Sequence, residues 1–334
     1  QEIYKIQKLM NKFTLLVSII VFSFFSSCNK LTGTKIIRLG HGLSTSHSVH
    51  MGMVHFGEKL EELSNGKFKV QIYPSQQLGT ERQCVELLQI GSLDMTKVSA
   101  SILENFAPSI KVFGIPYMFR DKTHCFSVLD GPIGKELLNG TEQFWLKGLG
   151  YYDSGSRSFY TIDKPLEGPN DLDGLKIRVM ESQTAIDMVK SLGGSPTPIS
   201  WGELYTALQQ GVVDGAENNP PSFYLSRHYE VCKYYILDEH TTVPDVILMS
   251  THLWNSLNDQ EQEWIQKAID LSITEQRRLW LESERESLEA VQSAGVQVSY
   301  PDKTLFSEKS KSVLEEYQKD PGLKIFIDKI KNTQ

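Results

Sequence analysis

Segments that alternate between apolar and polar residues are separated by longer segments of helical periodicity in the first part of the chain. Alternation predicts strands over residues 35–41, 68–74 and 95–99, because successive side chains of a strand point to opposite faces. Apolar residues at helical spacing predict helices over 47–63 and 80–90. Strands and helices that alternate at these lengths are typical of an α/β fold with helices on both faces of a sheet.

The same pattern begins again after residue 150. Strands and extended segments are predicted at 150–153, 159–161, 175–179, 195–198 and 212–216. Helices are predicted over 183–192 and 201–210, and Ser200 with Glu203 predicts a capping box at the start of the second one. The pattern therefore indicates a second α/β unit.

One predicted helix is much longer than the others. Residues 260–294 contain neither Gly nor Pro, and they carry an apolar stripe that drifts around the helix. A helix of this length would span about 50 Å, which exceeds the diameter of one lobe. We therefore expect it to brace two lobes. The alternative is a helix that is broken near Leu271 and Ser272.

The N-terminal segment is expected to be an export signal. Residues 13–25 are almost entirely apolar and follow a short basic region, but the stretch is too short to span a bilayer. Small residues then lead directly to Cys28, an order similar to that of a bacterial lipoprotein signal, in which Cys28 would carry lipid. The alternative is an ordinary signal peptide with an incidental cysteine. We expect a signal peptide over 1–28, with an upstream extension over 1–9, and a tether over 29–35.

Composition and charge narrow the class of partner. With 334 residues, 40% hydrophobic and 22% charged, the chain is long enough for two lobes with cores. The formal net charge of −7 and the lack of a Lys/Arg-rich block argue against nucleic acid. An anionic ligand would have to be held by local arginines. Cys84, Cys125 and Cys232 show no metal-binding spacing, and we expect buried free thiols.

Two arginines near predicted strands are the main candidates for ligand binding. Arg178 lies near the C-terminal end of one strand, Arg157 lies in an earlier strand-like run, and a polar cluster follows at 214–221. A guanidinium group binds a carboxylate through two parallel charge-assisted hydrogen bonds, so these residues could clamp a small carboxylate. The alternative is that each arginine pairs with a local acid, such as Asp173, Glu181 or Asp187.

Several segments together resemble the extracytoplasmic solute-binding proteins of TRAP transporters, the DctP-like family. They are YPSQQLG at 73–79, GSLDM at 91–95, GLKIRV at 174–179, SPTP at 195–198 and ALQQGVVDGAEN at 207–218. The resemblance extends from residue 36 to about 330. It implies a two-lobed, periplasmic-binding-protein-like fold, with a ligand cleft between the lobes and a long helix across both. Lobe I would comprise 36–154 and 243–282, and lobe II would comprise 155–242 and 283–334.

The same resemblance implies which residues bind the ligand. Arg178 matches the carboxylate anchor of the family, and Arg157 matches a second arginine found in sugar-acid binders. Asn218 matches an asparagine that supports the same carboxylate. Glu81 matches an acid that contacts ligand hydroxyls, and Trp201 matches an aromatic residue against which the ligand packs.

Three further residues match positions that face the cleft but vary within the family, namely His41, Ser99 and His240. Other interpretations stay open for some of the candidates. Glu81 could only cap its helix, Trp201 could belong to the core, and His240 could be a surface histidine.

We expect a binding protein that captures a carboxylate in the periplasm and delivers it to the TRAP permease in the membrane. It would use no cofactor and no metal, act as a monomer, and be attached to the membrane only through the lipid on Cys28. Residues 155–160 and 217–222 resemble those of hexuronate binders, and Glu81 as a hydroxyl acceptor also favours a sugar acid such as glucuronate or galacturonate. Sialic acid, aldonates and C4-dicarboxylates stay open.

Two other classes of function compete with this interpretation. An enzyme could use Glu81, Asp214 or His240 as an acid or a base. The sequence contains no Gly-Xaa-Ser-Xaa-Gly, no His-Glu-Xaa-Xaa-His and no phosphate loop, which argues against that reading. A sensor domain or a surface adhesin is the third hypothesis.

Overall fold

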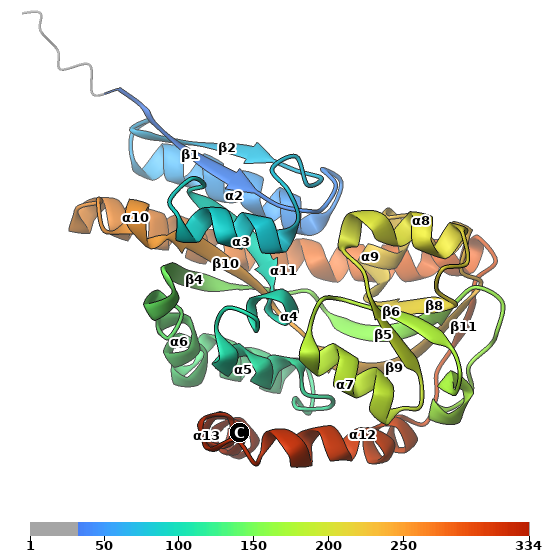
Figure 1. The fold of residues 1–334 in the computed structure, drawn as a ribbon. Coiled ribbons are helices and arrows are strands. Elements are labelled where there is room, and N and C mark those ends of the chain that lie inside the picture. Colours follow the sequence, from blue (N-terminus) through green and yellow to red (C-terminus); the bar gives the residue numbers. More distant parts are fainter. Residues whose placement is uncertain (1–32, 334) are drawn as a thin grey trace, which may run out of the picture. The chain divides into compact units, whose positions relative to one another are not determined.

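Two β-sheets organise residues 33–333, the part of the chain that the computed structural model describes (Figure 1). The strand order is β2-β1-β3-β10-β4 in the first sheet and β11-β9-β5-β8-β6-β7 in the second. The mixed α/β architecture predicted from the sequence is confirmed. The predicted signal peptide, Cys28 and most of the predicted tether lie outside the described residues.

The first sheet takes four strands from the N-terminal part of the chain and one from a later segment. Its strands are β1 Lys35–Gly40, β2 Phe68–Tyr73, β3 Met95–Ser99, β4 Leu146–Tyr152 and β10 Asp245–Ser250. β1 and β3 are parallel, whereas β10 runs antiparallel to both β3 and β4. Every residue of β3 and β10 is buried, because both strands are central and have neighbours on each side.

The second sheet is formed mainly by the middle of the chain. Its strands are β5 Ser156–Thr161, β6 Lys176–Val179, β7 Ser195–Pro198, β8 Gly215–Asn218, β9 Tyr234–Thr242 and β11 Gln297–Ser299. β6 is parallel to β7 and β8, and β5 is antiparallel to β8 and β9. The strand predicted at 212–216 begins later than expected, because Gly211 has a φ of +66° and continues the turn after the preceding helix.

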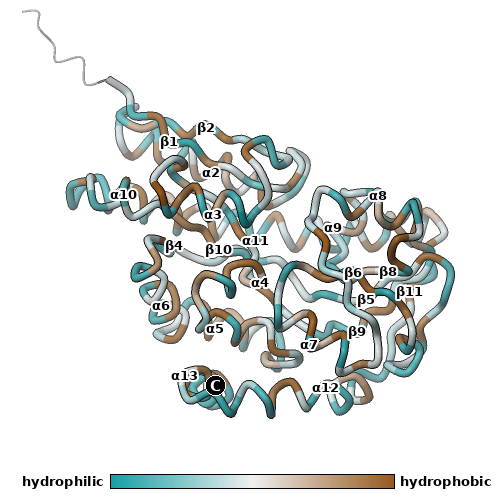
Figure 2. The backbone as a smooth tube through the Cα atoms, viewed as in Figure 1, coloured by the Kyte–Doolittle hydropathy of each residue, from teal (hydrophilic) through white to brown (hydrophobic). Residues whose placement is uncertain are grey.

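Helices cover both sheets. Those in the first part of the chain are α2 Ser48–Leu63, α3 Glu81–Gln89, α4 Ala100–Leu103, α5 Lys122–Asp130 and α6 Pro132–Asn139, with the 3-10 turns η1 Pro108–Gly114 and η2 Glu142–Phe144. The later ones are η3 Pro169–Leu172, α7 Gln183–Ser191, η4 Trp201–Glu203, α8 Leu204–Gln209, α9 Pro220–Leu225, η5 His228–Glu230 and α10 Thr251–Trp254. Figure 2 shows hydrophobic positions interleaved with hydrophilic ones along the helices, as expected when one face of a helix is buried.

The capping box predicted at Ser200 is wrong. The helix begins with the 3-10 turn η4, and Ser200 makes no side-chain cap. Its hydroxyl instead donates to Glu203 Oε2 at 2.6 Å. Because a 3-10 turn tightens the first turn, the amide that Ser200 would cap in an α-helix is not presented in the same way. Capping boxes are found at the starts of α3 and α11.

The long helix α11, Asp259–Ser293, is continuous and confirms the predicted brace. It packs against α2 and β4 on the side of the first sheet and against α9 on the side of the second (Figure 1). The buried Gln276 fixes it to the chain segment between β4 and β5. Gln276 Oε1 accepts from the Asp153 amide at 2.9 Å, and Nε2 donates to the Asp153 carbonyl at 2.8 Å.

The chain ends in two helices that contact different regions. α12, Lys303–Tyr317, packs against α7 and β9, whereas α13, Pro321–Asn332, packs against η1 and α6 (Figure 1). Leu323, Ile327 and Ile330 of α13 complete an apolar cluster that also contains Cys125 and Leu129. The contacts of α13 thus differ from the predicted assignment of residues 283–334 to lobe II. The lobe boundaries stay a prediction, because the described residues from Ile36 onward form one compact unit.

Two short segments connect the first sheet to the second. Residues 153–155 lead from β4 into β5, and residues 243–244 lead from β9 into β10. Ser154 Oγ donates to the Val243 carbonyl at 2.5 Å, so the two segments are hydrogen-bonded to each other. None of the helices in the described part of the chain is long and apolar enough to cross a membrane.

Candidate ligand-binding site

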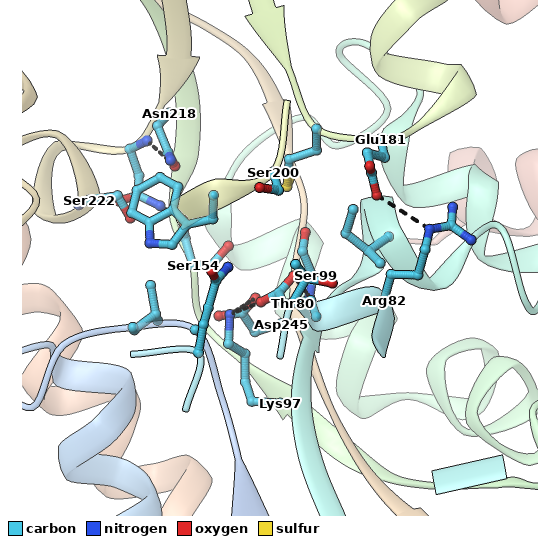
Figure 3. A pocket seen from close by; sticks show the side chains of 18 of the residues that line it. Thr80, Arg82, Lys97, Ser99, Ser154, Glu181, Ser200, Asn218, Ser222 and Asp245 are labelled. Atoms are coloured by element: carbon cyan, nitrogen blue, oxygen red, sulfur yellow. Dashed lines mark hydrogen bonds and ion pairs between the residues drawn. The ribbon is translucent and has the colours of Figure 1, made fainter. Parts of the chain in front are cut away.

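A cavity is lined by residues from elements of both sheets, with about 720 Å³ of atom-free space, part of it continuous with solvent (Figure 3). Six of the eight residues predicted from the sequence line it: Glu81, Ser99, Arg157, Arg178, Trp201 and Asn218. His41 and His240 do not. The structure therefore brings together residues that are far apart in the sequence, and the role of each in binding stays a prediction.

Arg178 is a buried cation without a carboxylate partner among the described residues. It lies on β6 and is 1% exposed. Nε donates to the Ile199 carbonyl at 2.9 Å, while Nη1 is buried and has no hydrogen-bond partner in the part of the chain that the structure describes. Burial lowers the pKa of Arg178 to about 10, so the group is still charged at neutral pH. A buried charge left unpaired is costly, and an anionic ligand would remove that cost.

The local acids considered as partners of Arg178 are engaged elsewhere. Asp173 lies 3.6 Å from Lys309, and Asp187 accepts from Gln183 and Tyr317. Glu181 pairs with Arg82 at 3.3 Å. Arg178 is therefore not neutralised by any of them.

Arg157, in contrast, is already paired. Its Nε contacts Glu217 Oε2, and Nη2 donates to Glu217 Oε1 at 2.9 Å and to the Glu217 carbonyl at 2.8 Å. Nη1 donates to Asn218 Oδ1 at 3.0 Å. Burial disfavours both charges, but the pairing more than offsets it. The pKa of Arg157 is raised, and that of Glu217 is lowered to about 2.

Asn218 is oriented by this pair. Its Oδ1 accepts from Arg157 and also from the amide of Asn219 at 2.9 Å. Because both contacts come from donors, the oxygen is fixed and the Nδ2 group is left to donate. Asn218 Nδ2 and Arg178 Nη1 together provide donors at the cavity, a chemistry that suits a carboxylate.

A second charged cluster lines the cavity from the first sheet (Figure 3). Lys97 Nζ donates to Glu81 Oε1 at 2.6 Å and to Asp245 Oδ1 at 3.1 Å. Burial opposes the charge of Lys97, but the two carboxylates raise its pKa. Burial raises the pKa of Asp245 to about 6, although Lys97 acts in the opposite direction. One ammonium group is thus shared by two carboxylates.

Glu81 is not the cap of its helix. Thr80 caps α3 with Gln83 in a capping box. The Glu81 carboxylate instead accepts from Lys97 and, through Oε2, from the amide of Ser99 at 3.1 Å. The Ser99 amide thus holds Glu81 at the cavity, while the Ser99 hydroxyl caps α4.

Three ring side chains also line the cavity, namely His47, Trp201 and Trp280. Trp201 is half-buried, and its ring centroid lies 6.0 Å from the Arg178 guanidinium; the same ring also packs on two apolar clusters. His47 caps α2, and its Nδ1 accepts from the Val49 amide at 3.2 Å. Burial lowers the pKa of His47 to about 3, so the ring is neutral and its proton lies on Nε2. That buried nitrogen has no partner among the described residues.

His41 and His240 have partners outside the cavity. His41 Nε2 lies 2.9 Å from His50 Nδ1. His240 is fully buried, so the surface alternative is wrong. Its Nδ1 lies 2.8 Å from Asp238 Oδ2, and its Nε2 is 3.5 Å from Glu217, an ion-pair distance that is long for a hydrogen bond. Burial opposes the charge, yet Asp238 and Glu217 raise the pKa of His240 to about 9.

Sequence reasoning missed several residues of the site. Lys97 and Asp245 could have been identified as site candidates from the sequence, because each is a charged residue in an otherwise largely apolar strand, MTKVS and DVILMS. Glu217 had a weaker signal, since it lies next to Asn218 in the polar cluster. His47 had none that separates it from a surface histidine. The described part of the chain holds no cluster of His, Cys, Asp and Glu that could bind a metal, and its three cysteines are buried free thiols, as predicted.

Comparisons with known proteins agree with this arrangement. Residues 39–320 match the DctP family model, described as bacterial extracellular solute-binding protein, family 7. A TRAP periplasmic solute-binding protein from a Bradyrhizobium species, solved with D-galacturonate, is 40% identical with a TM-score of 0.88, and the match covers 90% of this chain and 100% of that one. A protein from Anaerococcus prevotii, solved with D-glucuronate, is 36% identical with a TM-score of 0.87, over 90% and 98% of the two chains.

A relative of lower sequence identity is named for a different ligand. The sialic acid-binding periplasmic protein SiaP of Vibrio cholerae is 29% identical over 316 residues, which is 94% of this chain and 97% of that protein. The family match at residues 39–320 covers strands of both sheets and all the residues that line the cavity. The chain belongs to family 7 of the bacterial extracellular solute-binding proteins, the substrate-binding proteins of TRAP transporters, which are not enzymes.

Proposed function

We propose that this protein captures a hexuronate, such as galacturonate or glucuronate, and delivers it to the membrane permease of a TRAP transporter. The observation that carries the proposal is the buried guanidinium of Arg178, which has no carboxylate partner and an unsatisfied Nη1 among the described residues. A carboxylate that accepts from Arg178 and Asn218 would supply the missing counter-charge through charge-assisted hydrogen bonds. Arg157 would act mainly by fixing Asn218, with one N–H of Nη1 left for the ligand.

The remaining groups of the cavity favour a ligand that also carries hydroxyls. Glu81 and Asp245 accept hydrogen bonds, Lys97 and His47 Nε2 donate, and Trp201 offers an apolar face. A site built to pair hydroxyls leaves its own polar groups unsatisfied when the hydroxyls are absent. Succinate or malate would therefore bind more weakly than a uronate. A neutral hexose would leave Arg178 unpaired.

The bound ligands of two similar structures support this choice of substrate class. The proteins from Bradyrhizobium and Anaerococcus prevotii were solved with galacturonate and glucuronate, and their identities of 40% and 36% exceed the 29% of the sialic acid-binding relative. Sialic acid and aldonates are the alternatives that an experiment must separate from the uronates.

A ligand screen tests the proposal. Galacturonate, glucuronate, N-acetylneuraminate, galactonate, succinate and galactose would be compared by thermal shift, because a ligand that binds the native state raises the melting temperature by mass action. We expect a uronate to give the largest shift, to saturate at one equivalent in calorimetry, and to be recovered unchanged. A larger shift with succinate than with either uronate would refute the hexuronate assignment.

We also propose that Cys28 carries lipid and attaches the protein to a membrane on the periplasmic side. The support is the order of basic, apolar and small residues before Cys28 in the sequence. Expression of the full chain with Cys28→Ser should shift the protein from the membrane fraction to the soluble fraction or leave it uncleaved. An unmodified mature N-terminus at another residue, found by mass spectrometry, would contradict this proposal.

A further inference from the structure

The charges around the cavity do not balance locally. Two cations from the lining are each matched by one carboxylate: Arg82 by Glu181 at 3.3 Å, and Arg157 by Glu217 behind it. Arg178, from the second sheet, has no carboxylate partner among the described residues. The remaining charges of the lining belong to a cluster on the side of the first sheet, formed by Glu81 at the start of α3, Lys97 on β3 and Asp245 on β10.

That cluster has the opposite imbalance. Lys97 is the ammonium group for both Glu81 and Asp245, at 2.6 and 3.1 Å. Lys97 is also the only side chain in the described structure that hydrogen-bonds to Asp245. The side chains are 14%, 4% and 7% exposed for Glu81, Lys97 and Asp245, so water screens them poorly. One negative charge is therefore left over.

The cavity is thus polarised between its two sides. The second sheet presents one surplus positive charge at Arg178, and the first sheet presents one surplus negative charge at the Glu81–Lys97–Asp245 cluster. A ligand with a carboxylate at one end and hydroxyls at the other satisfies both sides, since hydroxyls can donate to Glu81 and Asp245. A ligand with carboxylates at both ends places its second negative charge beside the surplus carboxylate.

We propose that the Glu81–Lys97–Asp245 cluster makes the site selective for monocarboxylates and rejects sugar diacids by charge repulsion. This inference rests on the proposed function, because it assumes that the first carboxylate of the ligand lies on Arg178. Asp245 is the specificity-determining residue that sequence reasoning did not identify. Like charges brought together at a binding interface weaken the wrong ligand rather than strengthen the right one, which is specificity through repulsion.

The test uses two acyclic acids that differ only at one end. Galactonate and galactarate share their carbon chain and hydroxyls, but galactarate has a second carboxylate where galactonate has a primary alcohol. Dissociation constants for both would be measured by competition against galacturonate and by direct thermal shift. The proteins are the wild type, Asp245→Asn and Glu81→Gln, with Asp270→Asn as the control. Asp270 lies exposed on α11, so its substitution changes the net charge equally without touching the cavity.

We expect the wild type and Asp270→Asn to bind galactarate at least about tenfold more weakly than galactonate, because juxtaposed like charges are strongly unfavourable. In Asp245→Asn the dissociation constants for galactarate and galactonate should differ by no more than about threefold, since Lys97 then has one carboxylate partner. Glu81→Gln should move the ratio in the same direction, which covers the case in which one variant fails to fold. Circular dichroism would check folding.

Three results would overturn the inference. They are equal binding of the two acids by the wild type, an unchanged ratio in both cavity variants, and failure of galactarate to bind either variant up to its solubility limit. The proposed function fails separately, if neither uronate binds the wild type while the ratio of the acyclic acids still responds to Asp245→Asn.

Discussion

Arg178 is the residue on which ligand affinity should depend most. Its Nη1 is buried and has no hydrogen-bond partner in residues 33–333, so a bound carboxylate would find its strongest donor there. Arg178→Ala should lower the affinity for the best uronate by roughly 3–5 kcal/mol, since the ligand charge would be buried unpaired. Arg178→Lys should recover little, because an ammonium group cannot form two parallel hydrogen bonds. Isothermal titration calorimetry measures both.

The matched control is Arg285→Ala. Arg285 lies on α11 with 63% of its side chain exposed, and it forms ion pairs with the neighbouring Glu286 and Glu289. Its loss should leave the affinity unchanged, because exposed ion pairs contribute little. An Arg178→Ala affinity within a few-fold of the wild type would show that the carboxylate binds elsewhere.

The raised pKa of His240 predicts that the free energy of unfolding depends on pH. His240 does not line the cavity, so this effect is separate from ligand binding. Asp238 and Glu217 raise its pKa to about 9 against the effect of burial. Its contribution to the free energy of unfolding is therefore fully present below pH 6.5, where the unfolded chain is also protonated. It is lost as the pH rises from about 6.5 to 9. Integrated over that window, the loss is roughly 3 kcal/mol.

Urea unfolding of the wild type and His240→Gln at pH 6, 7.5 and 9 tests this effect. The wild type should be the more stable protein at pH 6, and its advantage should shrink steadily toward pH 9. A difference that stays constant over the three pH values would show that His240 is not held as a cation in the folded state.

At the scale of elements, α11 positions the segment from which the second sheet begins. Gln276 forms two hydrogen bonds with the backbone of Asp153, and both groups are buried. Gln276→Ala leaves an amide and a carbonyl unsatisfied, so we expect a loss of about 2–4 kcal/mol in the free energy of unfolding. Denaturant unfolding measures it. Gln292→Ala, at an exposed position of the same helix, should cost less than about 1 kcal/mol.

The elements that the sequence predicted well are those specified by local pattern. α11 could be predicted to within a residue or two, because its cap, its apolar stripe and the absence of Gly and Pro all lie within one segment. The strand after α8 was placed too early, because Val212 and Val213 have strand-forming side chains but lie in a turn.

The pairing of charges could not be predicted, because strand register decides it. Glu217 reaches Arg157 only because β5 and β8 are antiparallel, with Phe159 opposite Glu217. Asp245 reaches Lys97 because β10 pairs with β3 so that Ile247 lies opposite Lys97. Positions two apart on a strand share a face, so Asp245 and Lys97 lie on the same side of the sheet. A sequence shows the two arginines, but only the register shows which one is left unpaired.

At the scale of the whole protein, the site is divided between two sheets that are joined by short segments. Arg157, Arg178 and Asn218 belong to the second sheet, while Lys97 and Asp245 belong to the first. The contact between Arg82 and Glu181 also connects the two sides, but it is 37% and 42% exposed and would contribute at most about 1 kcal/mol. Buried hydrogen bonds connect the two sides as well, because Glu104 after α4 accepts from Ser182 and Thr184 at the start of α7. A ligand that contacts both sides would add to these contacts and so favour a closed arrangement.

Small-angle X-ray scattering tests this closure. Saturating galacturonate should reduce the radius of gyration of the wild type, because hinge motion about residues 153–155 and 243–244 would bring the two sheets together. Arg178→Ala at the same ligand concentration should give the profile of the free protein, since the second side has lost its anchor. Galactose should have no effect on either protein. An unchanged wild-type profile, with saturation verified by calorimetry on the same sample, would show that the site is preformed and that ligand binding does not require the two sheets to move.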